Sequence, residues 1–143
     1  MEIIIANEQR EARLNLKEVK ATAKNIAGIL KLPPESMLSI TFVSKYKIRR
    51  LNKRYFDKSA FTDVIALGYR GRTFKGARDL YLGDIIIAPL VAKENARAYK
   101  NSFSSELNLC ITHGILHLLG FSDKSSKEKE KMRKKEEQAL KRL

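Results

Sequence analysis

The sequence contains a single cysteine, no tryptophan and no long apolar run among its 143 residues. One cysteine, Cys110, excludes an internal disulfide and a metal site built wholly of thiolates. No apolar stretch approaches the ~18–20 residues that a membrane span needs. Residues 1–5 have no basic segment ahead of their apolar side chains and no small-residue cleavage site, so they do not resemble a secretory signal. We therefore expect a soluble cytoplasmic protein that folds as one domain over residues 1–143.

Acidic residues are also scarce, because 16 Asp and Glu stand against 29 Lys and Arg, which gives a net charge of +13. The excess is concentrated in three segments: residues 44–58 carry seven basic side chains and one acidic, residues 69–78 carry four and none, and residues 124–143 carry nine and four. Such concentrated charge favours a polyanion as partner, and nucleic acid is the commonest one. Adaptation to high temperature is an alternative that suits the mixed charges of residues 127–137 but not residues 69–78.

The spacing of apolar residues predicts the order strand, helix, strand, helix, strand, strand, helix, helix, helix. We expect the strands at residues 3–6, 38–42, 62–67 and 80–88, and helices that begin near Asn15, Ser44, Pro89, Phe103 and Ser125. This order predicts an α/β (α+β) fold with a small mixed sheet of about four strands flanked by about five helices. The fourth helix, residues 103–119, is apolar on most sides and is expected to be buried.

The two histidines of the chain, His113 and His117, lie four residues apart on this helix. That spacing puts both imidazoles on one face, about 6 Å apart along the axis, where they can reach one cation. Gly120 then lets the backbone turn so that Asp123 can supply a carboxylate oxygen. Two nitrogens and one carboxylate leave a fourth tetrahedral position for water, as in catalytic zinc sites. We therefore predict one divalent metal ion, zinc before any other, on these three residues; a hydrogen-bonded pair of core histidines is the alternative.

A partial likeness to metalloproteases limits the chemistry of this site. Their helix reads H-E-x-x-H, and the Glu acts as general base beside the metal-bound water. Gly114 stands at that position here, so peptide hydrolysis by that route is disfavoured. A metal-activated water could instead attack a phosphodiester while basic side chains stabilise the developing charge.

Further candidates surround this motif in the sequence. Asp84 is a candidate partner for a ligand imidazole or a general base, although it could equally cap backbone donors at the sheet edge. The candidate contacts to an RNA backbone are the basic residues of two segments. They are Arg49, Arg50, Lys53, Arg54 and Lys58 in the second helix and its end, and Arg70, Arg72, Lys75 and Arg78 in the loop between the third and fourth strands.

Residues 113–121, His-Gly-Ile-Leu-His-Leu-Leu-Gly-Phe, resemble the signature of the bacterial YbeY family of metal-dependent endoribonucleases. The family pattern H-G-x-L-H-L-x-G-[YF]-D-H binds zinc through three histidines. His113 and His117 match the first two, and the third falls on Asp123. A carboxylate in place of an imidazole is still a zinc ligand, but a harder and more anionic one.

The resemblance extends from about residue 51 to residue 123, because residues 51–52, 62–65 and 82–87 match other family segments in the same order. The chain departs from the family at Phe56, where an arginine is expected, at Phe61, where a proline is expected, and at residues 66–68. Phe56 could stack on a base of single-stranded RNA, but packing in the core is the commoner role for such a residue.

The resemblance implies a single-strand-specific, metal-dependent endoribonuclease that hydrolyses RNA phosphodiesters with a metal-activated water. It further implies ribosomal RNA maturation near the 3′ end of the small-subunit RNA, ribosome quality control, and the ribosome or its small subunit as partner. Two alternatives remain open. One is a non-catalytic RNA- or ribosome-binding factor with a structural metal, and the other is a metallohydrolase of another substrate class, such as a peptidase.

Overall fold

The computed structural model describes residues 1–69 and 80–143 of the chain. Within that part the strands and helices follow the predicted order. They are β1 (Glu2–Asn7), α1 (Leu16–Ile29), β2 (Ser36–Phe42), α2 (Lys45–Phe56), β3 (Val64–Gly68), β4 (Leu80–Ile87), α3 (Pro89–Ala98), α4 (Phe103–Leu118) and α5 (Ser126–Lys141). Among the described helices, none combines the length and the apolar character that crossing a membrane requires.

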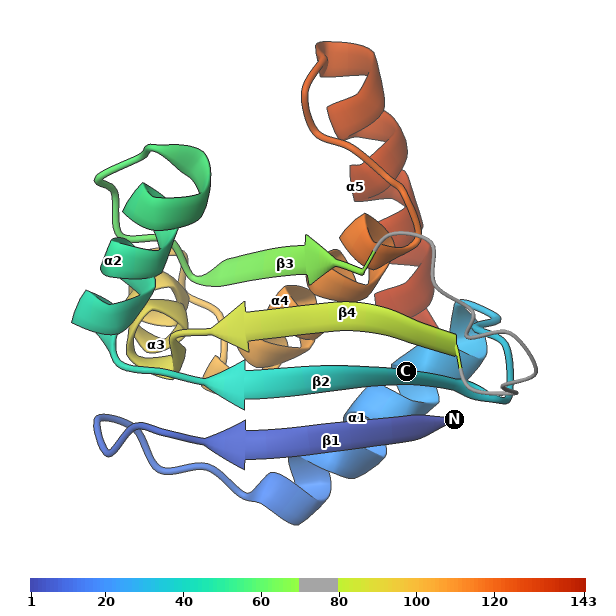
Figure 1. Ribbon diagram of the computed structural model, residues 1–143, viewed down its shortest axis with the longest axis horizontal. Coiled ribbons are helices and arrows are strands. Elements are labelled where there is room, and N and C mark those ends of the chain that lie inside the picture. The colour runs from blue at the N-terminus through green and yellow to red at the C-terminus, as the bar shows by residue number, and fades with distance from the viewer. Residues whose placement is uncertain (70–79) are drawn as a thin grey trace.

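The strands form one mixed sheet in the order β1-β2-β4-β3 (Figure 1). β1 and β4 both run parallel to β2, and β3 runs antiparallel to β4. The predicted mixed α/β architecture is therefore confirmed. β1, α1 and β2 make a parallel unit with a helical crossover, which parallel strands need because a tight turn cannot join them.

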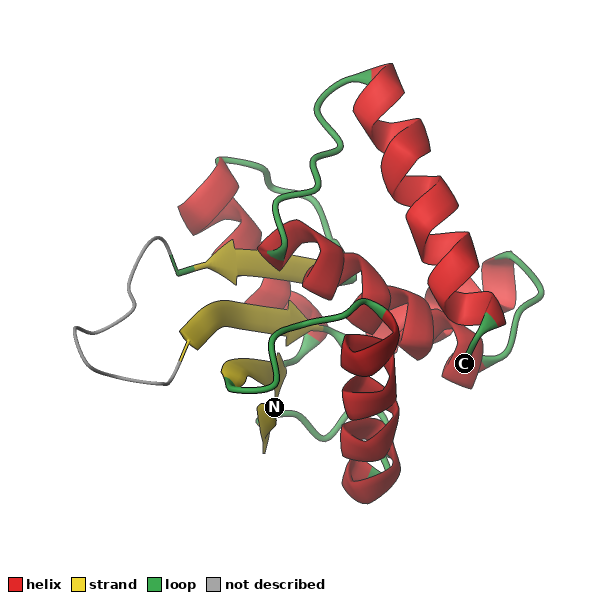
Figure 2. Cartoon of the chain, turned by 90° about the vertical axis from the view of Figure 1, so that its right-hand side faces the viewer, coloured by secondary structure: helices red, strands yellow, loops and turns green. Residues whose placement is uncertain are grey.

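Helices α1, α4 and α5 lie on one side of the sheet (Figure 2). The strands present alternate residues to this helical layer, so that Leu38, Ile40 and Phe42 of β2 are fully buried. A second, smaller cluster joins α2 to β3 and α3, where Ile48 packs with Ile65 and Val91. The protein is thus built from two layers, with the main core between the sheet and the helices.

Helix α4 is the most deeply packed helix of this layer, which confirms the predicted burial. Its backbone approaches β4 closely at Gly114, because a Cβ added there would lie 2.7 Å from Cγ2 of the fully buried Ile85. Only a residue without a side chain allows this approach. The contact fixes the height of α4 above the sheet, and with it the position of the neighbouring His113.

We predict that Gly114→Ala lowers the free energy of unfolding by about 1–3 kcal/mol, because the added methyl overpacks the core against Ile85. Gly28→Ala in α1 is the matched control, since a Cβ there meets nothing within 4 Å. The control should raise stability by about 0.5–1 kcal/mol through helix propensity. Denaturant unfolding measures both changes, and equal effects at the two glycines would contradict the close packing of α4 on β4.

Candidate metal centre

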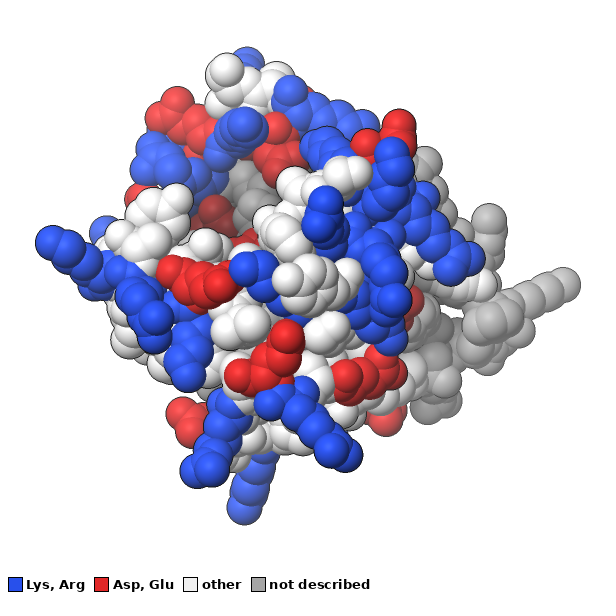
Figure 3. All heavy atoms as spheres, turned by 90° about the vertical axis from the view of Figure 1, so that its left-hand side faces the viewer, with Lys and Arg blue, Asp and Glu red and all other residues white. Residues whose placement is uncertain are grey.

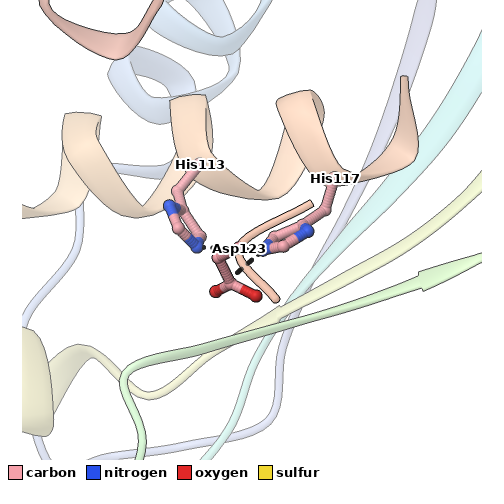
Figure 4. Close-up of side chains that lie close together, drawn as sticks. All are labelled: His113, His117 and Asp123. Atoms are coloured by element: carbon pink, nitrogen blue, oxygen red, sulfur yellow. Dashed lines mark hydrogen bonds and ion pairs between the residues drawn. The ribbon is translucent and has the colours of Figure 1, made fainter. Parts of the chain in front are cut away.

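The two predicted histidine ligands face each other from successive turns of α4. Their Nε2 atoms are 3.0 Å apart, and the ring planes are nearly perpendicular (Figure 4). Helical spacing of four residues accounts for this juxtaposition, because it stacks the two side chains on one face. Both side chains remain about a quarter exposed, so a ligand can reach them from the solvent.

The end of α4 brings Asp123 back toward the histidines. Gly120 has φ of +100° and donates its N–H to the carbonyl of His117, and Phe121 donates to the carbonyl of Leu116. This pair of bonds is a Schellman motif, in which glycine supplies the left-handed backbone that ends the helix. Oδ2 of Asp123 then lies 3.7 Å from Nε2 of His117, and one ligand atom from each of the three residues falls within 4.8 Å of the others.

The outer nitrogen of each imidazole has its own acceptor. Nδ1 of His113 lies 2.6 Å from Oε2 of Glu136 on α5, and Nδ1 of His117 lies 3.1 Å from the carbonyl oxygen of Phe121. A carboxylate and a carbonyl both accept, so each neutral ring carries its proton on Nδ1. The two Nε2 atoms are then both lone-pair donors pointed at each other, an arrangement that a cation between them stabilises.

The donor set fits one divalent cation. Two nitrogens bound to zinc at about 2.0–2.1 Å in tetrahedral geometry lie about 3.3 Å apart, close to the spacing seen here. His113, His117 and Asp123 supply two nitrogens and one oxygen, and Glu136 and Phe121 orient the rings as partners of metal-bound histidines do. An N₂O set with open positions also suits other first-row divalent ions.

The two imidazoles differ in their protonation. Burial lowers the pKa of His113, but the hydrogen bond and the charge of Glu136 outweigh burial and raise this pKa above its ordinary value. Burial and the neighbouring His113 lower the pKa of His117 below its ordinary value. Glu136 therefore makes the His113 ring a stronger base, and for the same reason a stronger metal ligand.

The histidines open into a cleft of about 570 Å³ that runs between the end of α2, β3, α4 and α5. Its charged side chains are Lys58, Asp63, Asp123, Lys124 and Glu136. Asp63 accepts hydrogen bonds from Asn95 and from the thiol of Cys110. Cys110 is 1% exposed, and burial followed by the charge of Asp63 raises its thiol pKa well above the usual value. These features suit Cys110 to packing, as its burial indicates.

Asp84 does not reach the metal site, in contrast to its predicted role beside a ligand imidazole. Its carboxylate accepts hydrogen bonds from Ser39 and Tyr81. Successive side chains of a β-strand point to opposite faces of the sheet. Ile85 faces α4, so its neighbour Asp84 points to the other face. Asp84 therefore joins a polar group on the sheet surface.

The predicted RNA-contacting residues of the second helix are all exposed. Lys58 lines the metal cleft, whereas Arg49, Arg50 and Lys53 line a separate hollow of about 380 Å³ beside Tyr46. Lys and Arg side chains are spread over the face of the protein drawn in Figure 3. The four predicted loop residues, Arg70, Arg72, Lys75 and Arg78, lie outside the described part of the chain.

Two further residues, Phe56 and Glu136, differ from the sequence interpretation. Phe56 is 47% exposed and lines the cleft, so its expected core packing is wrong. Glu136 was not identified, although it is 9% exposed and hydrogen-bonded to His113. A signal for it exists, since Glu136 lies between Met132 and Ala139 on the buried stripe of α5, where an isolated acid needs a partner.

A family model described as Endoribonuclease YbeY matches residues 4–143 of the chain. The chain belongs to the YbeY family. An Endoribonuclease YbeY from Thermodesulfovibrio yellowstonii is 34% identical over 97% of this chain and 95% of its own length. The Endoribonuclease YbeY of Staphylococcus saprophyticus is 41% identical over 74% of this chain and 71% of its own.

A solved structure shares the fold. The solution structure of a Thermotoga maritima protein is 30% identical to this YbeY-family chain, with a TM-score of 0.60. The match covers 98% of this chain and 90% of that one. The predicted resemblance to the family, which rested on residues 51–123, is confirmed and extends over nearly the whole chain.

We predict that, in the metal-free protein, His113 takes up its proton at higher pH than His117. Glu136→Gln should lower the pKa of His113, because the charge that raises it is removed while burial still lowers it. Since the folded-state pKa is raised, the stabilisation from protonated His113 is full below the unfolded pKa and is lost as pH rises through the folded value. NMR titration of the two imidazoles measures this order, and the reverse order would contradict it.

We also predict that Glu136→Ala weakens binding of a divalent metal about 10- to 100-fold, because the His113 ring loses its acceptor and its fixed orientation. Glu136→Gln should weaken binding less, since the amide oxygen still accepts from Nδ1. Glu137→Ala is the matched control on the same helix, because Glu137 pairs with exposed Arg133. Competition with a chromophoric chelator measures the affinities, and equal losses at 136 and 137 would argue against this role.

Proposed function

We propose that this chain is a metal-dependent endoribonuclease that hydrolyses single-stranded RNA during ribosomal RNA maturation. The observation that carries the proposal is the His113, His117 and Asp123 set in the wall of an open cleft, beside a strongly basic helix. The names of the relatives, Endoribonuclease YbeY, support RNA cleavage. Family resemblance also supports the 3′ end of the small-subunit RNA as target, ribosome quality control and the ribosome as partner.

In the proposed function, one group of residues holds a cation and another binds a phosphate. His113, His117 and Asp123 would hold one divalent ion, with zinc our first choice, and Glu136 fixes the ring of His113. When bound, such an ion supplies Lewis acidity and an activated water. Lys58 lines the same cleft and can neutralise the phosphate at the reacting centre, where an ammonium attracts a phosphate as a point charge.

Helix α2 supplies the surface that would bind the rest of the strand. Arg49, Arg50 and Lys53 surround one hollow on its outer side, with the exposed ring of Tyr46 beside them. Cations hold the sugar–phosphate backbone, and aromatic rings accept unstacked bases, a combination suited to single strands. This surface therefore favours RNA over a neutral or basic peptide.

The peptidase alternative is opposed by the packing of α4. The H-E-x-x-H route of metalloproteases needs a general base at position 114, but the Cβ direction of Gly114 points at Ile85 of the core rather than into the cleft. No side chain at this position could serve the metal site without displacing the sheet contact. The non-catalytic alternative assumes a structural metal. Asp123, whose side chain is half exposed on a surface turn, is the residue that separates the two functions by experiment.

We predict that Asp123→Ala abolishes RNA cleavage, with a loss above about 100-fold, while the affinity for RNA and the fold persist. The reason is that Asp123 contributes to the metal site from an exposed turn and supports no core contact. Glu137→Ala, at an exposed acid of α5 that pairs with Arg133 and lies outside the cleft, is the control.

For both variants we would measure the metal content by elemental analysis, the melting temperature and the affinity for RNA. RNA cleavage is measured with and without chelator. A structural metal predicts the opposite pattern. The wild type would then cut no RNA under any metal, and Asp123→Ala would lose metal and stability together. Cleavage by the wild type that is unaffected by chelator would also contradict the proposal.

A further inference from the structure

The core-facing stripe of α2 continues past the part of the helix that is packed. Ile48 and Asn52 are buried at positions four residues apart, and the same spacing leads from Asn52 to Phe56. Phe56 is nevertheless 47% exposed, and it lines the cleft that contains His113 and Asp123. An aromatic ring in a core-facing position thus borders the metal cleft instead of entering a core.

The backbone around Phe56 is firmly held. Asp57, the residue after it, has φ of +55° and donates its N–H to the carbonyl of Lys53, which closes the helix. The side chain of buried Asn52 donates to the carbonyl of Ala60 and so fixes the following turn. Phe56 is therefore the last residue of a capped helix. Because its backbone is already ordered, a ligand that contacts its ring loses little free energy in ordering this segment.

A second exposed phenylalanine nearby provides a contrast. The ring of Phe61 is edge-on to Tyr46 at 5.5 Å and lies under the cationic groups of Lys45 and Arg49, at 4.8 and 4.9 Å. Phe56 makes no such aromatic or cation–π contact with any residue that the structure describes. The ring of Phe61 is thus occupied by the protein itself, and that of Phe56 is available to a ligand in the cleft.

We propose that Phe56 is the stacking platform for one nucleobase of the RNA strand in the cleft, an inference that rests on the proposed function. Every base has a π-face, and stacking on an aromatic ring holds unpaired bases without regard to sequence. Lys58, two residues further on, lines the same cleft and would contact a phosphate of that nucleotide. A flat uncharged ring and a cation that line one cleft offer partners for both halves of a nucleotide, the base and the phosphate. A paired base is stacked within its own duplex, so the platform selects single strands.

The test compares two probes in the presence of chelator, so that no hydrolysis intervenes. One is a short single-stranded oligoribonucleotide, and the other is an oligomer of equal length and charge without bases. Fluorescence anisotropy should give the wild type a preference of about 5- to 100-fold for the probe with bases. Phe56→Leu, which retains apolar bulk without a π-face, should bring this ratio toward one and leave the affinity for the abasic probe unchanged. Phe56→Trp should retain the ratio.

Two controls separate stacking from charge and from general surface effects. Lys58→Ala should weaken both probes equally and reduce the salt dependence, because it removes a phosphate contact. Tyr99→Leu, at a ring 72% exposed at the end of α3, should change neither affinity. A Phe56→Leu protein that keeps the wild-type ratio, or that weakens both probes equally, overturns the proposal.

Cleavage by metal-loaded wild type is scored separately from these affinities. If the base preference depends on Phe56 but no RNA is cut, the stacking platform stands and the proposed nuclease function fails. If RNA is cut and the preference does not depend on Phe56, the platform is refuted and the nuclease function stands. Phe56→Leu and Phe56→Trp keep a large apolar side chain, so the comparison does not depend on a variant truncated to alanine.

Discussion

Two imidazole nitrogens held 3.0 Å apart, each with its lone pair turned to the other, are the constraint on which the rest of the site depends. Two such acceptors repel unless a positive charge lies between or beside them. The pair cannot separate easily, because both rings project from one buried helix whose backbone at Gly114 rests on Ile85. The fold therefore maintains an arrangement that a cation stabilises, and the depth of α4 in the core is what maintains it.

The last helix of the chain is part of the same arrangement. A buried carboxylate destabilises a protein unless a charged or hydrogen-bonding partner compensates for its lost hydration. The partner of Glu136 is Nδ1 of His113. This one hydrogen bond therefore both holds α5 against α4 and orients the ring of a candidate metal ligand. The Schellman turn acts likewise at the other ring, since the carbonyl of Phe121 that orients His117 belongs to the turn that returns Asp123. Loss of either element would disturb both the packing and the ligand set.

The features that could be predicted from the sequence depend on residues close together in the chain. The spacing of His113 and His117, the glycine turn and the return of Asp123 are local patterns, and the structure joins them as expected. Individual side-chain contacts between distant elements were not predicted. Glu136 meets His113 only because α5 packs on α4, and the sheet register that turns Asp84 away depends on how β2 pairs with β4. The exposure of Phe56 depends on which elements pack against the end of α2, and the helical pattern of apolar residues alone does not show this.

On the face drawn in Figure 3 charges of both signs are interspersed, whereas the cleft gathers three carboxylates. Asp63, Asp123 and Glu136 all line the cleft, where their combined negative charge favours a divalent cation over a phosphate. The guanidinium groups of Arg49 and Arg50 line a separate hollow outside it, where they attract a polyanion without competing for the metal site. Solvent and salt screen the outer charges more strongly than those within the cleft. Lys58 and Lys124 line the same cleft, so positive charge also borders the candidate metal site.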